Sequence, residues 1–173
     1  MKKSSYLDMS RCVGCGACVV ACMDQNDVYP ECGQVAFRRI YQIEDGLPPC
    51  GTIQYVSAGC RHCEDSPCLI SCPTGAIFQD KETGAILTDE DRCIGCHSCA
   101  LACPFGVPRY DRNDKLNKCN LCSVRIMNGL LPSCVKVCPN NALVYESINN
   151  LMGDKELHYL GDLVGAVQKA VKS

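Results

Sequence analysis

The spacing of the cysteines constrains this chain more than any other feature of its sequence. Eighteen of the 173 residues are Cys, and sixteen of them form four groups of four. The groups are Cys12, Cys15, Cys18 and Cys22; Cys60, Cys63, Cys68 and Cys72; Cys93, Cys96, Cys99 and Cys103; and Cys119, Cys122, Cys134 and Cys138. Each group begins with Cys-x2-Cys and ends with Cys-x3-Cys. Such a count in so short a chain demands a chemical explanation, and the regular spacing favours metal ligation.

The first and third groups have the spacing C-x2-C-x2-C-x3-C, which is typical of [4Fe–4S] ligation in bacterial ferredoxins. Three cysteines at two-residue gaps wrap a loop around one cluster, and the fourth, one helical turn later, ligates a neighbouring cluster. The groups must therefore work in pairs, and four groups predict four [4Fe–4S] clusters. Structural zinc instead takes two C-x2-C pairs separated by a long gap. Disulfide formation does not require the spacing seen here.

The composition and charge of the chain argue against several functions and indicate its cellular compartment. The formal charge is −2, which does not suggest a nucleic-acid-binding protein. The N-terminus has two lysines but no apolar stretch after them, and no run is long enough to span a bilayer, so we expect neither a signal peptide nor membrane insertion. We expect a cytoplasmic protein with reduced thiols. The alternative is export together with a partner that carries the signal.

Two echoes within the sequence indicate a duplicated module. The residues before Cys12 recur before Cys93, and Cys72-Pro73-Thr74-Gly75-Ala76-Ile77 recurs as Cys138-Pro139-Asn140-Asn141-Ala142-Leu143. The fold class that this predicts is α+β, with two pseudo-symmetric dicluster ferredoxin-like lobes built from short helices, small antiparallel β-hairpins and many loops.

Between the first two groups, the pattern predicts strands over 35–43 and 53–57 with a turn at 44–46. A helical turn is expected over 123–129. The segment 151–173 has aliphatic residues at helical spacing and predicts a C-terminal helix, either packed on the protein or docked on a partner.

With all four groups placed, the sequence resembles the iron–sulfur subunits of the dimethyl sulfoxide reductase and formate dehydrogenase type. The specific stretches are Asp8 to Cys15, Cys60 to Cys68, Cys103 to Asp111, and Lys118 to Cys122 followed by Arg125, Gly129, Pro132 and Cys134. The resemblance implies that the protein is not an enzyme by itself. It implies a subunit that relays single electrons between a molybdopterin or tungstopterin catalytic subunit, of the formate, aldehyde or S/N-oxide type, and a second partner. That partner could be a flavin subunit, a hydrogenase, a membrane anchor subunit or further copies of this chain.

The resemblance also implies which cysteines share a cluster, which spacing alone does not show. Cluster 1 would take Cys12, Cys15, Cys18 and Cys138; cluster 2 Cys22, Cys119, Cys122 and Cys134; cluster 3 Cys60, Cys63, Cys68 and Cys103; and cluster 4 Cys72, Cys93, Cys96 and Cys99. Lobe A would then comprise residues 1–58 with 113–150, and lobe B residues 59–112, followed by the tail 151–173.

Two other functions fit the residues. A free polyferredoxin would shuttle electrons between enzymes, and a zinc-stapled module would have no redox role. The sequence contains no nucleophile, phosphate loop or dinucleotide fingerprint, so one-electron exchange is the only chemistry it supports.

Several residues near the groups leave alternatives open. Cys32 and Cys50 are expected to be unligated thiols, with a disulfide between them as the alternative. His62 and His97 are expected to donate hydrogen bonds near cluster sulfur. Arg11, Arg92 and Lys118 each precede a first Cys and either offset cluster charge or are solvated. Val13, Val19, Ile77, Ile94, Leu101 and Val107 are expected to shield the clusters from water.

Overall fold

The computed structural model describes residues 3–47, 50–147 and 149–153 of the chain. Its helices are short: α1 (Ala17–Gln25), α2 (Pro67–Ile70), α3 (Ser98–Ala102), α4 (Ser123–Met127), α5 (Ser133–Lys136) and the 3-10 turns Met9–Arg11 and Pro30–Cys32. The strands are β1 (Lys3–Leu7), β2 (Arg39–Asp45), β3 (Thr52–Ala58), β4 (Ile77–Gln79), β5 (Ile86–Thr88), β6 (Arg109–Tyr110), β7 (Leu116–Asn117) and β8 (Leu143–Ser147). They form antiparallel pairs β1–β8, β2–β3, β4–β5 and β6–β7. The expected α+β class, with short helices and small antiparallel hairpins, is confirmed.

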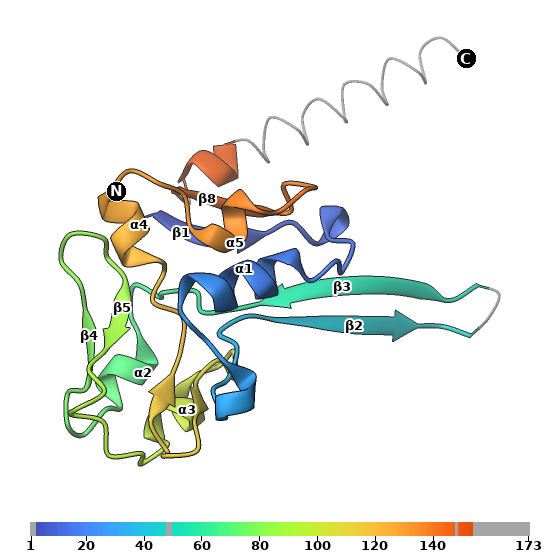
Figure 1. Cartoon of the computed structure of the whole chain (residues 1–173). Helices are drawn as coiled ribbons and strands as arrows, with labels where there is room; N and C mark the ends of the chain where they lie inside the picture. The colour runs from blue at the N-terminus through green and yellow to red at the C-terminus, as the bar shows by residue number, and fades with distance from the viewer. Residues whose placement is uncertain (1–2, 48–49, 148, 154–173) are drawn as a thin grey trace, which may run out of the picture.

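The first and last strands of the described residues pair with each other. In the β1–β8 ladder, Lys3 lies opposite Ser147 and Leu7 opposite Leu143. Helix α1, which follows the first two cysteines of group one, packs against α5, which lies around the third cysteine of group four. Figure 1 shows these elements together in one half of the molecule. Distant parts of the sequence are thereby brought to one place.

The middle of the sequence forms the other half. Strands β4 and β5 pair from Ile77 opposite Thr88 to Gln79 opposite Ile86, and α2 packs on α3. Figure 1 shows β4, β5, α2 and α3 away from the β1–β8 pair. Because the elements here are contiguous in sequence, local pairing is enough to form this half.

The β2–β3 hairpin projects from the body (Figure 1). The predicted hairpin is confirmed, but its bounds differ from the prediction. The ladder begins at Arg39 rather than residue 35, because Arg38 turns inward and its guanidinium donates to Ser57. It continues through Asp45, which pairs with Thr52, so that the chain turns only from Gly46, whose φ is +84°. Glycine accepts this left-handed conformation without steric cost.

The remaining element predictions have mixed outcomes. Short strands, β4 and β8, follow Cys72 and Cys138, and the predicted helical turn after Cys122 is confirmed as α4. The C-terminal helix is predicted for a segment whose residues 154–173 lie outside the described part of the chain. In the part of the chain that the structure describes, no helix combines the length and apolar character needed to cross a bilayer.

The apolar cores are small and contain sulfur. One consists of Cys18, Cys134, Val135 and Leu143, and the other of Ile77, Ile86, Cys99 and Leu116, each with partly buried neighbours. Trp is absent, and none of the three Phe belongs to either of these two apolar cores. Cores of this size rarely stabilise a protein without disulfides or bound metal.

Candidate cluster sites

The first candidate site is a small cavity at the β1–β8 end of the molecule. It is lined by Cys12, Cys15, Cys18 and Cys138, together with the loop Val13 to Gly16. Gly14 and Gly16 have φ of +69° and +76°, so the loop curls around the cavity. Three cysteines of group one and the last of group four therefore face one space.

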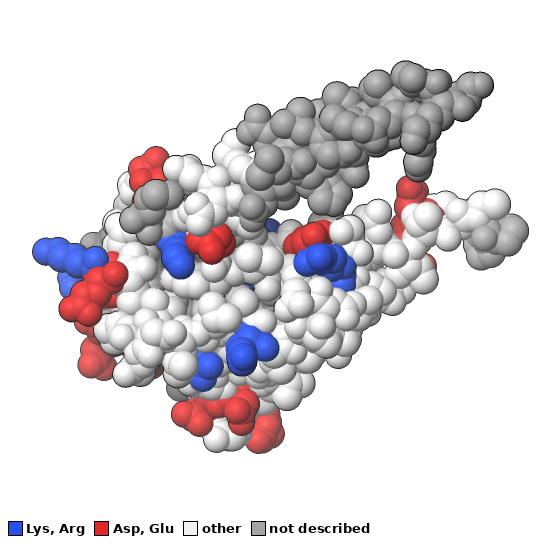
Figure 2. Space-filling view, turned by 90° about the horizontal axis from the view of Figure 1, so that it is seen from above, with Lys and Arg blue, Asp and Glu red and all other residues white. Residues whose placement is uncertain are grey.

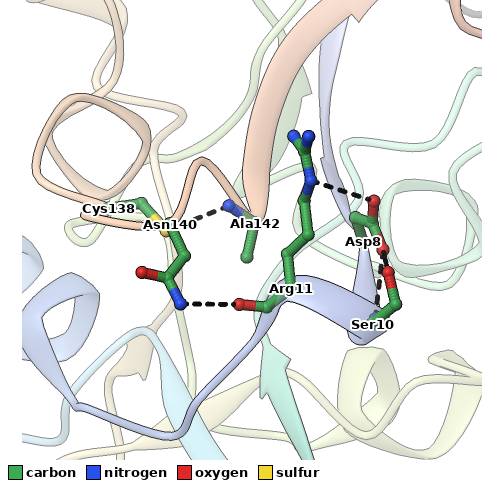
Figure 3. A network of polar contacts seen from close by, with 6 residues as sticks. All are labelled: Asp8, Ser10, Arg11, Cys138, Asn140 and Ala142. Atoms are coloured by element: carbon green, nitrogen blue, oxygen red, sulfur yellow. Dashed lines mark hydrogen bonds and ion pairs between the residues drawn. The ribbon is translucent and has the colours of Figure 1, made fainter.

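Hydrogen bonds tie the two chain segments around this cavity (Figure 3). The backbone N–H of Ala142 donates to Cys138 Sγ at 3.2 Å, and Asn140 Nδ2 donates to the carbonyl of Arg11 at 3.2 Å. Asp8 N donates to the carbonyl of Ala142 at 2.8 Å. An N–H group aimed at sulfur stabilises negative charge there, as a thiolate or a cluster ligand requires.

The second small cavity lies between α1 and the fourth group. It is lined by Cys22, Cys119, Cys122 and Cys134. The backbone N–H of Leu121 donates to Cys119 Sγ at 3.3 Å, and Asn26 Nδ2 lies 3.7 Å from Cys22 Sγ. Leu121 and Cys122 have φ of +59° and +51°, which are unusual values for residues other than glycine. This strained backbone points the N–H of Leu121 at the sulfur of Cys119.

The third small cavity lies in the other half of the molecule. Its cysteines are Cys72, Cys93, Cys96 and Cys99. The hydroxyl of Tyr110 lies 3.0 Å from Cys99 Sγ, and Thr74 Oγ1 lies 3.7 Å from Cys72 Sγ. Burial, followed by the interaction with Cys99, raises the pKa of Tyr110, so its hydroxyl keeps its proton and can donate.

The remaining four group members lie around α2 and the loop before it. Burial raises the pKa of Cys68 to about 11, and the nearby Cys60 and Cys103 sulfurs raise it too. The backbone N–H of His62 donates to Cys60 Sγ at 3.4 Å, and Ser66 Oγ donates to the carbonyl of Cys63 at 2.7 Å. The two hydrogen bonds fix the turn that contains Cys60 and Cys63.

The donor sets fit iron–sulfur clusters. Among the described residues, no three Cys, His, Asp or Glu side chains are grouped as they would be around a single metal ion. The three cavities instead each have four thiols around a space, and several of these thiols receive N–H or O–H groups. Burial raises the pKa of Cys119 to about 12, so without metal this thiol is protonated at neutral pH. Bound iron would displace the proton, because ligation requires the thiolate.

One buried cation near these sites has no counterpart in the sequence predictions. Arg38 lines the second cavity with only 4% of its surface exposed, and Ser57, its hydrogen-bond partner, lines the first. Burial alone would lower the pKa of Arg38, but the negative charge that Cys134 and Cys119 can carry outweighs this and raises it. Alternation along the predicted strand implies that one of Arg38 and Arg39 faces inward, but no sequence signal identified Ser57 as its partner.

The structure resolves the alternatives for the three basic residues before the cysteine groups. Arg11 is exposed and pairs with Asp8 at 3.8 Å, and Arg92 is exposed and donates to the carbonyl of Thr74 at 2.8 Å. Lys118 is 6% exposed. Its Nζ donates to the carbonyls of Ile86 and Cys119. Lys118 is therefore the buried one of the three, whereas Arg11 is exposed although it lines the first cavity.

The predicted shielding residues divide into two classes. Ile77 is buried at 3% exposure, as expected. Val13, Ile94 and Leu101 are 56%, 67% and 89% exposed, but Val13 and Ile94 also line the first and third cavities, so their shielding role stays a prediction. Each of the three lies close to a cysteine on a loop or short helix that has no second layer of protein over it.

The two cysteines outside the groups are both exposed free thiols. The disulfide alternative for Cys32 and Cys50 is not realised in the structure, and neither residue is buried as a small hydrophobe would be. Neither of them lines the three cavities.

Charge on the surface agrees with the sequence interpretation. On the face shown in Figure 2, Lys and Arg alternate with Asp and Glu, and much of the surface is uncharged. This face therefore carries no basic stripe of the kind that binds a nucleic-acid backbone.

Comparison with known proteins identifies the family. A family model described as a 4Fe-4S dicluster domain matches residues 52–148, and one described as a 4Fe-4S binding domain matches residues 5–22. A chain of the anaerobic dimethyl sulfoxide reductase of Escherichia coli K12 is 41% identical over 155 residues, which cover 84% of this sequence and 74% of the relative. The thiosulfate reductase electron transfer subunit PhsB of Salmonella typhi is 42% identical over 162 residues, covering 87% and 81%. A subunit of the sulfite dehydrogenase of Allochromatium vinosum is 36% identical over 163 residues, covering 83% and 68%. The chain therefore belongs to the 4Fe-4S dicluster family, among the iron–sulfur subunits of molybdopterin oxidoreductases.

Proposed function

We propose that this chain holds four [4Fe–4S] clusters and relays single electrons between a molybdopterin or tungstopterin catalytic subunit and a second redox partner. The observation that carries the proposal is the set of three cavities, each lined by four cysteines and in part by residues far apart in the sequence. Family membership supports the same role, because relatives are named as parts of reductase and dehydrogenase complexes.

All sixteen grouped cysteines would serve as ligands. The proposed sets are Cys12, Cys15, Cys18 and Cys138 for cluster 1; Cys22, Cys119, Cys122 and Cys134 for cluster 2; Cys60, Cys63, Cys68 and Cys103 for cluster 3; and Cys72, Cys93, Cys96 and Cys99 for cluster 4. Two ferredoxin-like lobes follow from these sets, with residues 1–58 and 113–150 in lobe A and residues 59–112 in lobe B. The shared ladder β1–β8 supports the joining of the two segments of lobe A.

A bound [4Fe–4S] cluster supplies reversible one-electron exchange without making or breaking covalent bonds in a substrate. The chain's own residues position the ligands and set the local charge. Backbone N–H groups of Leu121 and Ala142 donate to ligand sulfurs, and Arg38 provides a buried positive charge. Each of these favours the more negative, reduced form of a site, and so raises its reduction potential.

The two ends of the relay would lie at clusters 1 and 4. Cys15 and Cys96 are exposed, whereas Cys22, Cys122 and Cys134 of the second cavity are buried. Val13 and Ile94 line the first and third cavities and are themselves exposed. A partner that docked on either loop would cover an aliphatic side chain and bring its own redox centre close to the cluster site.

The catalytic partner would act on a sulfur compound. The three relatives are named for dimethyl sulfoxide, thiosulfate and sulfite. The second partner would be a flavin subunit, a hydrogenase, a membrane anchor subunit or a further copy of this chain.

Native purification tests the proposal. The complex should contain a pterin–metal subunit, and the iron-loaded chain should be brown and undergo stepwise reduction without turning over a substrate. A native peak at 18.8 kDa alone would instead support a free polyferredoxin. A colourless protein that contains zinc would overturn both redox functions.

A further inference from the structure

His62 joins the loop of one proposed site to a ligand of another. It lies between Cys60 and Cys63, which belong to the cluster 3 set, and the residue is 1% exposed. Its Nε2 lies 3.4 Å from the Sγ of Cys119, which belongs to the cluster 2 set. The ring therefore spans the boundary between the two proposed lobes.

The hydrogen bonding of the ring fixes the direction of this contact. The backbone N–H of Ile86 donates to His62 Nδ1 at 3.0 Å. A ring nitrogen that accepts a hydrogen bond carries no proton, so the neutral ring carries its proton on Nε2. The Nε2–H group is then the donor, and Cys119 Sγ is the acceptor.

Ile86 is hydrogen-bonded to both sides of the contact between His62 and Cys119. Ile86 is 1% exposed, and its carbonyl accepts a hydrogen bond from Lys118 Nζ, which also donates to the carbonyl of Cys119 at 2.9 Å. The N–H of Ile86 positions His62, and its carbonyl positions the segment that carries Cys119. The donor and the acceptor are thus anchored to one buried residue, which limits their relative movement.

The second histidine of the cysteine loops is arranged differently. His97 Nε2 lies 3.5 Å from Asp114 Oδ1, and its ring stacks on Tyr110 with centroids 3.8 Å apart. Its side chain is 49% exposed. Both histidines have left-handed φ, +47° for His62 and +62° for His97, so the two positions are matched in backbone and differ in their contacts.

We propose that His62 is a positioning residue that couples the two halves of the relay, because its Nε2–H donates to Cys119 Sγ and raises the reduction potential of the site that Cys119 holds. This rests on the proposed ligation by Cys119. When that site accepts one electron from a reductant, its charge becomes more negative by one. The proton stays on Nε2, no bond is made or broken, and the hydrogen bond strengthens. Removal of the donor should therefore make reduction of this one site less favourable.

Two substitutions separate the two contacts of the ring. His62→Asn keeps an acceptor near the Nδ1 position for Ile86 N–H and suits the left-handed backbone, but its side chain is too short to reach Cys119 Sγ. His62→Gln places an amide N–H near the Nε2 position and loses the acceptor for Ile86. His97→Asn is the matched control.

Potentiometric titration with EPR detection, on the iron-loaded full chain, tests the proposal. The relevant signal is first identified as the one altered in Cys122→Ser. His62→Asn should raise the ratio of oxidised to reduced form at that site about tenfold at a fixed potential, a shift of about 59 mV for one electron. His62→Gln should restore most of the lost reduction potential, and His97→Asn should leave the midpoint potential of that signal unchanged.

Unshifted midpoints in a His62→Asn protein with four intact clusters would overturn the inference. If that variant does not assemble its clusters, ¹⁵N labelling of histidine in the unmodified protein decides instead. A hyperfine coupling from a ring nitrogen to the Cys119 site supports the inference, and its absence overturns it. An unmodified protein that holds no iron would overturn the proposed function itself, which is a different result.

Discussion

Arg38 and Ser57 form a buried pair at the base of the β2–β3 hairpin. Nη1 of Arg38 donates to the Ser57 carbonyl at 3.2 Å and to Ser57 Oγ at 3.0 Å. Ser57 Oγ in turn lies 3.3 Å from Cys18 Sγ. The pair therefore connects a permanent positive charge to a cysteine of the first cavity, while Arg38 itself lines the second.

Replacement of this charge should lower two reduction potentials. Arg38→Gln removes a cation from between the first and second cavities, so the reduced forms there lose electrostatic stabilisation. With an effective dielectric constant of about 20, the loss is about 1.4–3 kcal/mol, or roughly 60–130 mV per site. Redox titration with EPR detection measures it. Arg39→Gln is the control, and an equal shift in both variants would contradict a specific role for Arg38.

Cys138→Ser should damage the site of the first cysteine group rather than the site that contains Cys119. Cys138 and Cys12 line the same cavity, although more than a hundred residues separate them. EPR of the reduced protein, together with iron analysis, should show loss or conversion of one cluster. Cys32→Ser and Cys50→Ser are matched controls, since both thiols are exposed and free, and they should retain four clusters. Loss of the Cys119 site instead would mean that the proposed pairing is wrong.

Tyr110→Phe should lower the potential of the site in the third cavity. The change removes a hydroxyl 3.0 Å from Cys99 Sγ and leaves the ring, with its stacking on His97, in place. Loss of one hydrogen bond to a charged acceptor should change the potential on the order of 40–60 mV, about 1–1.4 kcal/mol. Tyr145→Phe, at a partly buried position in the other half, provides the comparison. A potential that moves equally in both would point to a general effect of aromatic substitution.

Removal of iron should destabilise the whole fold. The two small cores include cysteines of the sites, so the bound metal would replace the apolar burial that they lack. Loss of about 5 kcal/mol would lower Tm by roughly 10–20 °C in a protein of this length. Circular dichroism melts before and after anaerobic chelation measure this. An unchanged Tm after complete loss of iron would show that the polypeptide core suffices.

The sequence carried enough information to predict the small antiparallel hairpins and the helical turn after Cys122, because cysteine spacing and turn residues are local signals. The strand limits around Arg38 and Asp45 were less predictable. There, tertiary contact with Ser57 removes one residue from the ladder, and Gly46 delays the turn. Local propensity contains neither of these effects.

Within the sites, the hydrogen-bond donors were the least predictable part. Both histidines are expected near sulfur for the same reason, yet it is the His62 ring that lies 3.4 Å from Cys119 Sγ, whereas the His97 ring turns to Asp114. Both histidines have the same left-handed backbone conformation, and both lie in a cysteine loop. The difference arises from Ile86, a residue more than twenty positions from His62, and such long-range placement leaves no periodic trace in sequence.

The pairing of β1 with β8 has a consequence for biosynthesis. Cys60 to Cys103 form a contiguous stretch that is translated while Cys138, the proposed partner of the first group, is still to come. The nascent polypeptide must therefore carry Cys12, Cys15 and Cys18 with their cavity open until the last strand arrives. With the proposed ligand sets, iron delivery to this half would be a late event, after the middle of the sequence has its complete set of thiols.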